Sequence, residues 1–401
     1  MVNYVFLSVY FYSVPNLRFS YKGDWSKRKL NEICLFFKGN GLSKSDLSNE
    51  GFPCILYGEL YTTYKNEVIS DIISKTNTTL SNPFLSRNND LIIPGSGEDP
   101  IDIAVARAIY QNDIILGGDL NILRPKSNVS AAFLSYQLNG VRRYDIAKKA
   151  QGKSIVHLHN SDLKEVLVSI PSYDEQLHIV KLLTKIDEMI ETQSKIIGDY
   201  NSLKKGIIQH IFNVNYEFPN VHLKAVLKEI SQKNKNRDNI DVLSVSNSLG
   251  FIKQSEQFED REIASADTSN YKIVNKNEYA YNPARINVGS IARLQSCDCG
   301  IVSPMYTVFK TDISKISYEY FDLFLQSSTF QKQLNQKLEG SVRQCLTFAS
   351  MQNILIELPP LEMQIEISEK MKFIDSKIKI ESDYLNLLKT EKEYLLKNMF
   401  V

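Results

Sequence analysis

Two similar stretches of the chain, IPSYDEQLHIVKLLTKIDEMI at 170–190 and LPPLEMQIEISEKMKFIDSKI at 358–378, decide the fold. In each, a proline is followed five residues later by a glutamine, and a long run with recurring apolar residues comes next. The surrounding segments 151–212 and 339–400 align without a gap, at a constant offset of 188 positions. Self-similarity at a fixed offset indicates an internal duplication. We therefore expect a globular part and a long segment, each occurring twice in alternation.

Both long segments have the apolar spacing of a coiled coil. Apolar residues recur at alternating steps of four and three, which places them on one stripe of a helix. Both stripes are interrupted at the same two places, by Gln193 and Lys204 in the first copy and by Glu381 and Lys392 in the second. A polar residue on such a seam costs stability but restricts register and partner. A generic amphipathic helix packed on a core is the alternative, and it leaves the shared interruptions unexplained. The predicted seam consists of Ile179, Leu183, Ile186, Ile190, Ile197 and Tyr200, with Ile367, Met371, Ile374, Ile378, Leu385 and Leu388.

Helix length constrains the arrangement of these parts. A helix over residues 175–212 would run about 57 Å at 1.5 Å per residue. The loop after it, 213–220, is too short to return the chain to the start of that helix. The second helix can then bury its seam only by running back along the first. We expect an α+β protein with two related globular domains, separated by a pair of long antiparallel coiled-coil helices with an internal pseudo-two-fold duplication. The predicted segments are 1–13 (an extension of uncertain role), 14–150 (first globular domain), 151–212 (first repeat with its helix), 213–338 (second globular domain) and 339–401 (second repeat with its helix).

The two globular parts show mixed signals of strands and helices. Short runs rich in Ile, Val and Tyr, bounded by Gly, Asn, Ser and Pro, indicate strands. These runs are 53–57, 90–93, 114–116, 241–245, 278–281 and 305–309, and helical stretches are expected at 130–138 and 318–325. The order of the strands does not follow from these patterns.

The loops of the globular parts carry residues of the types that contact nucleic acid. Arg and Lys suit guanine edges, Asn and Gln suit adenine, and Ser or Thr can contact either base or a phosphate. For any single residue a solvated loop is the simpler interpretation, but the set as a whole favours DNA binding. The candidate contacts are Lys38, Asn40, Tyr57, Thr62, Tyr64, Lys65, Ser96 and Lys153 in the first half, and Ser246, Asn247, Lys253, Arg285, Asn287, Ser290, Arg293, Ser303, Tyr306 and Arg343 in the second.

Composition narrows the class of protein. A formal net charge of +1 leaves no global basic field, so nucleic-acid binding must use local patches. The five cysteines are scattered and odd in number, which argues for a reducing compartment. The apolar residues 1–13 lack the features of a signal peptide, and no segment reaches the length of a membrane span. We expect a cytoplasmic protein without a membrane contact.

Two short motifs resemble catalytic or metal sites but lack their context. The run AKKAQGKS at 147–154 imitates a phosphate-binding loop, yet a helix-like stretch precedes it and a strand-like one follows, the reverse of what that loop requires. The pairs HLH at 157–159 and CDC at 297–299 are each without the second close pair that structural zinc usually has. We therefore predict no ATP site, no metal and no catalytic residue in this chain.

The chain resembles the specificity subunits of type I restriction–modification systems. The similarity lies in PNLRF at 15–19, NNDLIIPGSG at 88–97, NEYAYNPARINVGSIA at 277–292 and the twin blocks that open the long helices. The second copy departs from the first in having Met363 opposite Glu175 and Ser341 opposite Lys153, which affects only local detail.

This resemblance implies a non-catalytic subunit that reads DNA. Each target recognition domain would read one half of a split, asymmetric site, and the helices would fix the spacing between the halves. The helices would also dock methyltransferase subunits, two in number, and these would recruit restriction/translocase subunits. The implied cofactors, S-adenosylmethionine, ATP and Mg, would be bound by those partners and not by this chain. The alternative from a different class is a coiled-coil scaffold or adaptor that does not bind DNA.

Overall fold

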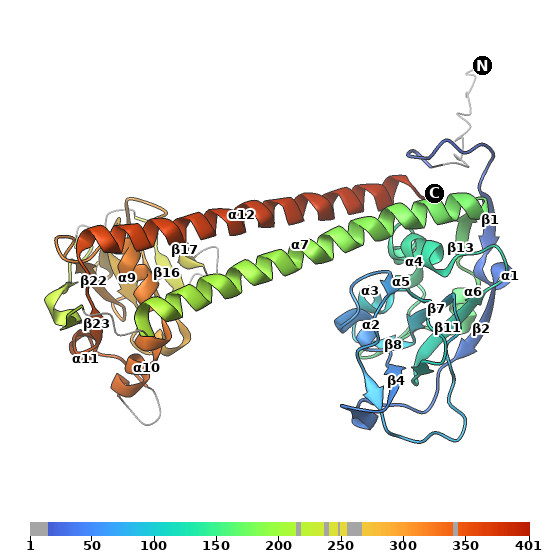
Figure 1. Ribbon diagram of the computed structural model, residues 1–401, viewed down its shortest axis with the longest axis horizontal. Coiled ribbons are helices and arrows are strands. Elements are labelled where there is room, and N and C mark those ends of the chain that lie inside the picture. The colour runs from blue at the N-terminus through green and yellow to red at the C-terminus, as the bar shows by residue number, and fades with distance from the viewer. Residues whose placement is uncertain (1–14, 214–217, 236–239, 248, 255–266, 340–343) are drawn as a thin grey trace, which may run out of the picture. The chain divides into compact units, whose positions relative to one another are not determined.

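The chain divides into two compact units in a computed structural model that describes residues 15–213, 218–235, 240–247, 249–254, 267–339 and 344–401 (Figure 1). Unit 1 comprises Met1–Lys195 and Ser382–Val401, and unit 2 comprises Ile196–Glu381. Each unit therefore contains a globular part together with one segment from each of the two long helices.

The two long helices are confirmed. Helix α7 spans Tyr173–Asn213 and helix α12 spans Leu361–Asn398. Acidic residues lie in the first turn of each, where they interact favourably with the positive end of the helix dipole. None of the helices within the described ranges is long and apolar enough to cross a membrane.

The duplicated glutamine joins each long helix to its globular part. Gln176 is fully buried, and its Oε1 accepts a hydrogen bond from Ser130 N at 2.9 Å while its Nε2 donates to Pro171 O at 3.1 Å. Gln364 does the same in unit 2, accepting from Ser317 N at 2.9 Å and donating to Pro359 O at 2.8 Å. Both serines are helix N-caps, of α4 (Ala131–Asn139) and α9 (Tyr318–Leu325). The Pro-x-x-x-x-Gln pattern is thus a docking device for the helix start.

Unit 1 is built on a mixed five-stranded sheet in the order β2-β11-β7-β9-β5, antiparallel except for β5 beside β9. Alternate residues of β7 enter different cores: Leu91 and Ile93 pack with α4, whereas Ile92 packs with β4, β10 and α2. The strands are β1 (Ser26–Lys29), β2 (Cys34–Lys38), β3 (Leu47–Ser48), β4 (Phe52–Ile55), β5 (Val68–Ile69), β6 (Lys75–Thr76), β7 (Asp90–Pro94), β8 (Ser96–Gly97), β9 (Arg107–Ile109), β10 (Ile115–Leu116), β11 (Leu120–Pro125), β12 (Val156–His157) and β13 (Leu167–Ile170). The shorter helices are α1 (Leu30–Ile33), α2 (Glu59–Thr62), α3 (Pro100–Ile103), α5 (Arg143–Ala147) and α6 (Asn160–Lys164).

Unit 2 repeats this plan with a smaller sheet in the order β15-β22-β19-β20. The order corresponds strand for strand to β2-β11-β7-β9, and Tyr279 and Ala280 of β19 again enter different cores. The strands are β14 (Asn220–His222), β15 (Leu227–Ile230), β16 (Leu243–Ser246), β17 (Gly250–Lys253), β18 (Lys272–Asn275), β19 (Tyr279–Tyr281), β20 (Ile291–Arg293), β21 (Cys299–Val302), β22 (Thr307–Thr311) and β23 (Leu355–Glu357). The other α-helices of unit 2 are α10 (Ser328–Lys337) and α11 (Phe348–Gln352), and the described residues also form 3-10 helices at Lys44–Asp46, Leu223–Ala225 and Ile286–Val288.

The sequence patterns located the regular elements well. All six strand-like runs overlap strands, and the helical stretches 130–138 and 318–325 are α4 and α9. The imitation phosphate loop at 147–154 follows α5 and precedes β12, which is the wrong order for phosphate binding. All five cysteines are free thiols.

The glutamine contacts predict a large effect of a small substitution. Gln176→Ala should lower the free energy of unfolding by about 1–3 kcal/mol, because the buried N–H of Ser130 loses its acceptor. Thr192→Ala, an exposed substitution on the same helix, should change it by no more than about 0.5 kcal/mol. Urea unfolding followed by circular dichroism compares the two, and equal stabilities would contradict the docking role of Gln176.

Candidate nucleic-acid interface

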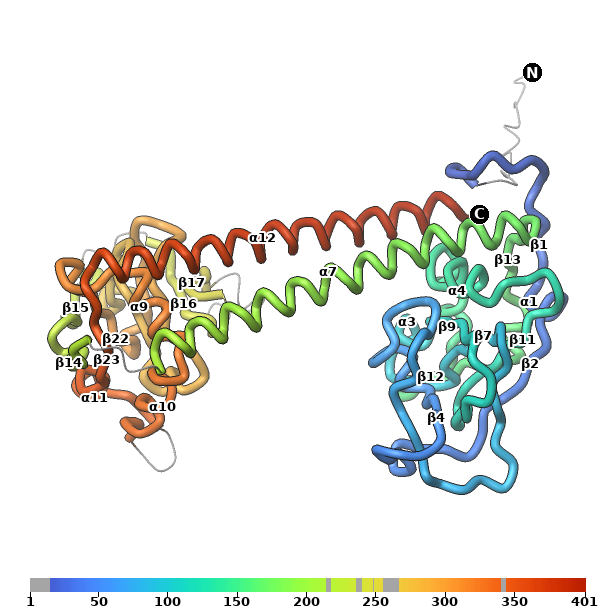
Figure 2. The backbone as a smooth tube through the Cα atoms, in the orientation of Figure 1, coloured from blue at the N-terminus to red at the C-terminus, as the bar shows by residue number. Residues whose placement is uncertain are grey.

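Three loops of unit 1 meet where β2 and β7 end and β11 begins. Lys38 is the last residue of β2, Ser96 follows β7, and Asp119 precedes β11. Ser96 Oγ donates to Asp119 Oδ2 at 3.0 Å, and Gly95 N donates to Asp119 O at 2.5 Å. Burial lowers the pKa of the Lys38 ammonium, and nearby Asp119 acts in the opposite direction. In the tube view β4 and β12 lie in the part of unit 1 that is away from α7 (Figure 2).

Two of the predicted residues line a hollow beside these loops. Tyr57 and Thr62 face a surface hollow of about 700 Å³ that also includes Asp119 and apolar Leu42. Asp119 is a residue that the sequence analysis missed. It adopts a left-handed backbone with φ of 56° directly after two glycines. The run Gly-Gly-Asp is typical of a turn, and this pattern in the sequence could have indicated the loop. The hollow therefore combines an aromatic ring, a hydroxyl and a carboxylate.

Other candidates of unit 1 have different surroundings. Tyr64 is buried, and its hydroxyl accepts a hydrogen bond from Ile73 N at 3.2 Å. The amide of Asn40 binds the backbone of the 82–84 segment through both of its polar atoms. Lys65 is exposed, with Nζ 3.4 Å from Tyr61 O. Tyr64 and Asn40, together with the buried Ser96, thus serve the internal structure of the unit, and we leave them out of the proposed reading surface.

Lys153 lies exposed in a turn whose closing hydrogen bonds recur in unit 2. The turn is closed by reciprocal backbone hydrogen bonds between Gln151 and His157, and Leu158 N then donates to Gly95 O at 2.9 Å. The same three bonds recur at the offset of 188, as Glu339 with Cys345 and Leu346 N with Pro283 O at 3.0 Å. Arg343, the candidate in the corresponding stretch of unit 2, lies outside the described residues.

In unit 2 five predicted residues share one surface hollow of about 460 Å³. They come from the end of β16 and from the loop that follows β19, and they are Ser246, Asn247, Arg285, Asn287 and Ser290. The side chains of Asn247, Arg285 and Asn287 are exposed, whereas Ser290 is buried and its Oγ donates to Val245 O at 3.0 Å. A Cβ on Gly289 (φ of 93°) would lie 3.3 Å from Asn247, so glycine allows these two loops to approach closely.

The remaining candidates of unit 2 are held by neighbouring groups. Arg293 donates to Asp322 Oδ2 at 2.7 Å and to Asn277 Oδ1 at 3.0 Å, with its side chain only 8% exposed. It therefore stabilises the interior, and we leave it out of the reading surface as well. Lys253 pairs with Asp241 at 2.8 Å, and the Tyr306 hydroxyl accepts from Val245 N at 3.3 Å. The backbone oxygen of Ser303 accepts from Tyr306 N at 3.0 Å within the same turn.

The predicted seam residues are all buried or half-buried. In unit 1, Ile179, Leu183 and Ile186 of α7 belong to one apolar cluster with Leu395 of α12 and with Met399, which directly follows that helix. In unit 2, Ile208 and Ile211 of α7 share a cluster with Ile367, Met371 and Ile374 of α12. The early part of each helix thus packs on the late part of the other, which is the antiparallel pairing.

The lysines that interrupt the seam pair with aspartates of the opposite helix. Lys392 Nζ lies 2.6 Å from Asp187 Oδ1 in unit 1, and Lys204 Nζ lies 2.5 Å from Asp375 Oδ1 in unit 2. The two lysines are counterparts in the repeat, because they lie 188 positions apart. The two aspartates lie 188 positions apart as well. Burial alone would lower the pKa of Lys392, but two neighbouring carboxylates outweigh it and raise that pKa above its usual value. The other interrupting residues, Gln193 and Glu381, are buried and half-buried.

Comparison with known proteins assigns the family. The model of the type I restriction modification DNA specificity domain matches residues 22–198 and again residues 227–390. The chain belongs to this family. DNA sequence recognition is therefore the role of its two matched regions, each of which carries one of the loop clusters described above.

Relatives of this family match the chain over most of its length. Two are from Methanocaldococcus jannaschii: the putative type I restriction enzyme MjaX specificity subunit is 23% identical, and the MjaVIII specificity subunit is 21% identical. Both alignments cover 89% of this chain and 88% of the relative. The fold is similar to that of the type I restriction–modification S subunit from M. genitalium, with a TM-score of 0.60, 15% identity and coverage of 97% and 99% of the two chains. A structure from a study of complex assembly and conformational transition of the type I R-M system gives a TM-score of 0.57 with 14% identity, covering 93% of this chain and 96% of that one.

Among the described residues, no group of three or more His, Cys, Asp or Glu side chains could hold a metal ion.

The two crossed ion pairs predict unequal effects of the same substitution. Lys392 is 16% exposed beside Asp187 (5% exposed) and Glu67 (7% exposed), so Lys392→Met leaves two buried carboxylates without their cation. We expect the free energy of unfolding to fall by about 3–5 kcal/mol. Lys204 faces an aspartate that is 50% exposed, and Lys204→Met should cost no more than about 1 kcal/mol. Denaturant unfolding of the two variants tests this difference, and a loss of similar size in both would refute it.

Proposed function

We propose that this subunit reads a split, asymmetric DNA site, with unit 1 reading one half and unit 2 the other. The observation that carries the proposal is a duplicated backbone framework with unlike side chains on its loops. The Gly95–Leu158 contact and its counterpart Pro283–Leu346 hold the two loop clusters in the same way. Yet unit 1 presents Lys38, Tyr57 and Asp119, whereas unit 2 presents Asn247, Arg285 and Asn287. Different donors and acceptors on the two loop clusters would select different bases.

The exposed side chains support direct reading of bases in unit 2. Arginine donates two hydrogen bonds to guanine, and asparagine pairs in the same manner with adenine. Arg285 and Asn287 lie two residues apart on one loop with Asn247 beside them, which places both kinds of donor at one surface. In unit 1 an exposed lysine and an exposed carboxylate lie at the corresponding end of the sheet, on other loops, and a carboxylate accepts from the amino group of cytosine.

We propose that partner subunits supply many of the phosphate contacts and all of the chemistry. A net charge of +1 is low for a protein that binds DNA alone, because phosphate contacts dominate affinity. Methyltransferase subunits, two in number, would bind S-adenosylmethionine, and restriction/translocase subunits would bind ATP and Mg. The chain itself would contribute recognition without catalysis.

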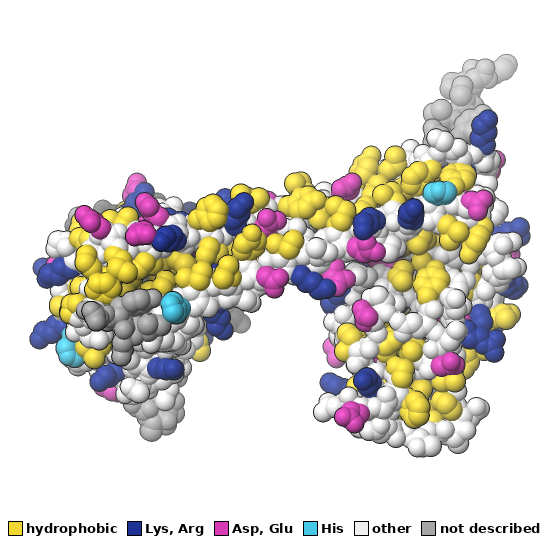
Figure 3. All heavy atoms as spheres, viewed as in Figure 1, with side chains coloured by type: hydrophobic (Ala, Val, Ile, Leu, Met, Phe, Trp, Pro, Cys, Tyr) yellow, Lys and Arg dark blue, Asp and Glu magenta, His cyan; other side chains and the backbone are white. Residues whose placement is uncertain are grey.

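The outer faces of the long helices suit such partners. Along α12, Phe373, Ile380, Leu387 and Tyr394 recur every seven residues and are 58–67% exposed. The space-filling view shows apolar side chains at the surface of these helices (Figure 3). A regular apolar stripe that is exposed on a helix is typical of a surface that binds another helix.

Exchange of one unit tests the division of labour. Replacing residues 25–150 by those of a relative with another specificity should change one half of the recognised site and leave the other half intact, because the loops of unit 2 are untouched. Sequencing of the DNA that the partner methyltransferase modifies in cells identifies both halves. Unchanged specificity would refute the assignment of unit 1, and a mobility-shift assay with random duplexes shows whether the complex binds DNA at all.

A matched deletion tests whether helix length sets the spacer. Residues 192–198 of α7 and 381–387 of α12 lie between the two crossed ion pairs, so removing both heptads keeps each pair. The helices shorten by about 10 Å at 1.5 Å per residue, and the preferred spacer should shorten by about three base pairs. Selection from duplexes with spacers of varied length measures this preference, and deletion of only one heptad should destroy the seam. An unaltered spacer preference in the double deletion would contradict the proposal.

A further inference from the structure

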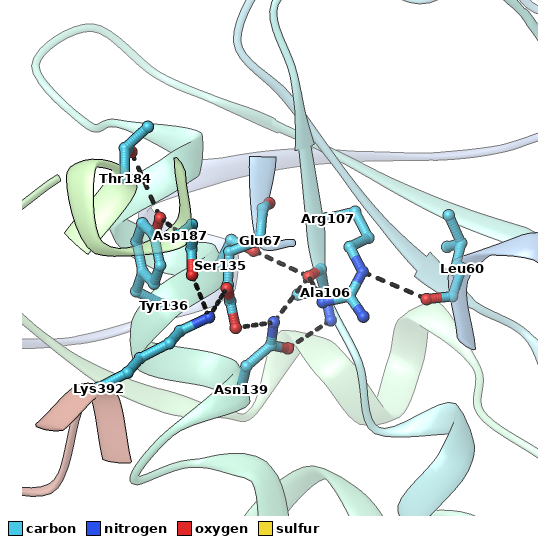
Figure 4. Close-up of polar contacts among 10 residues, drawn as sticks. All are labelled: Leu60, Glu67, Ala106, Arg107, Ser135, Tyr136, Asn139, Thr184, Asp187 and Lys392. Carbon is cyan, nitrogen blue, oxygen red and sulfur yellow. Dashed lines mark hydrogen bonds and ion pairs between the residues drawn. The ribbon is translucent and has the colours of Figure 1, made fainter. Parts of the chain in front are cut away.

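Lys392 bonds to the globular part of unit 1 as well as to α7. Its Nζ lies 2.6 Å from Glu67 Oε2 and 2.6 Å from Asp187 Oδ1, so one ammonium joins three separate segments of the chain (Figure 4). The lysine is 16% exposed, and the two acids are 7% and 5% exposed. The Tyr136 hydroxyl donates to the second oxygen of Asp187 at 2.6 Å. A buried charge cluster therefore connects α12, α7 and the sheet-bearing part of unit 1.

Glu67 is itself fixed firmly within the globular part. Its backbone oxygen accepts from Ser135 Oγ at 2.9 Å and from Ala108 N at 2.8 Å, the latter in strand β9. Asn139 Nδ2 lies 3.4 Å from the other carboxylate oxygen, as the close-up shows (Figure 4). Because Glu67 directly precedes β5, its carboxylate cannot move far without disturbing the edge of the five-stranded sheet. Its bond to Lys392 thus relates the orientation of this sheet to the helices.

Unit 2 has no equivalent link among its described residues. Lys204 pairs with Asp375, which lies on α12, so that pair joins helix to helix only. The globular part of unit 2 is attached by aromatic packing of Phe212 on Tyr320 and Phe324, with ring centroids 5.2 and 5.4 Å apart. Hydrogen bonds between uncharged groups add to this packing, from Thr329 Oγ1 to Phe212 O at 2.7 Å and from Ser328 N to Gln209 Oε1 at 3.1 Å. An ion pair does join Lys372 of α12 to Glu319, but these side chains are 63% and 35% exposed at 3.5 Å. Exposed pairs of this kind fix orientation weakly.

We propose that Glu67 and Lys392 are positioning residues for DNA reading, which set the direction in which unit 1 presents its loops from the helical pair. The inference rests on the proposed function. It adds that the contact between Glu67 and Lys392 makes unit 1 sensitive to the length of the spacer. A buried ion pair has strict geometric demands, since both ions are costly to bury unless they meet at hydrogen-bonding distance. Apolar packing and hydrogen bonds between uncharged groups, which attach unit 2, tolerate small rotations more readily. The cluster therefore specifies an orientation more than it adds stability.

The decisive variant is Glu67→Met, which removes the link and leaves Lys392 paired with Asp187. The full chain is used together with its co-expressed methyltransferase partner, in a binding selection from duplexes with randomised half-sites and variable spacers. Base preferences within both half-sites should persist, because none of the exposed residues proposed to read bases changes. The enrichment of the native spacer over spacers one base pair longer or shorter should fall by about tenfold, the size of a typical single-position discrimination.

Two further variants separate positioning from general damage. Glu67→Gln keeps an oxygen within reach of Lys392, and the spacer preference should return most of the way to that of the natural protein. Lys204→Met removes the counterpart pair in unit 2 and should leave the spacer preference unchanged. Thermal unfolding of each variant reports on folding.

The outcomes distinguish this inference from the proposed function. A Glu67→Met protein that folds and keeps the narrow spacer preference overturns the inference and leaves the proposed function standing. Equal broadening in Lys204→Met overturns it too, because the effect would then not belong to the Glu67 link. Absence of any sequence preference in the natural protein would instead overturn the proposed function itself.

Discussion

The structure depends on a lysine and an aspartate that were duplicated together and pair crosswise. Asp187 meets Lys392, and Asp375 meets Lys204, so each pair joins one copy of the repeat to the other. Both pairs can form only when the helices run antiparallel in a single register, because the two lysines and the two aspartates keep the same separation along each helix. A slip by one heptad would leave each lysine on an apolar seam without its partner, at a cost of several kcal/mol for the buried one.

Duplication copied this pair, but divergence of the surroundings gave the two copies different roles. Around Lys392 the globular part supplies a second acid, Glu67, and a tyrosine whose pKa burial and Asp187 raise far above its usual value. The carboxylates thereby keep the lysine charged in a buried place. Around Lys204 no second acid is present among the described residues, and Asp375 is half exposed. The same two residues are therefore an anchor in unit 1 and a surface pair in unit 2.

Local patterns in the sequence predicted the helices and strands but not the contacts between residues far apart in the chain. The apolar spacing predicted α7 and α12, and the shared interruptions indicated that Lys204 and Lys392 had a common role. Nothing local indicated that Glu67 would meet Lys392, because 325 residues separate them. The loop candidates were chosen by residue type, and type does not distinguish the exposed Arg285 from Arg293, which Asp322 holds inside unit 2. Asp119 was missed because its importance comes from the three loops that meet at it.

The duplicated framework can carry unlike loops because its hydrogen bonds join backbone atoms. The contacts that hold the loops in both units, Leu158 N to Gly95 O and Leu346 N to Pro283 O, join backbone atoms and demand little of the side chains. The glutamine that docks each helix also binds backbone groups at every position. Loop side chains can therefore change while the framework stays constant, and new specificities cost little stability. Glu67 and Tyr136 are exceptions, since their side chains belong to a recognition unit and yet complete a charge cluster of the helices. An exchanged unit must supply an acid there to keep the same orientation.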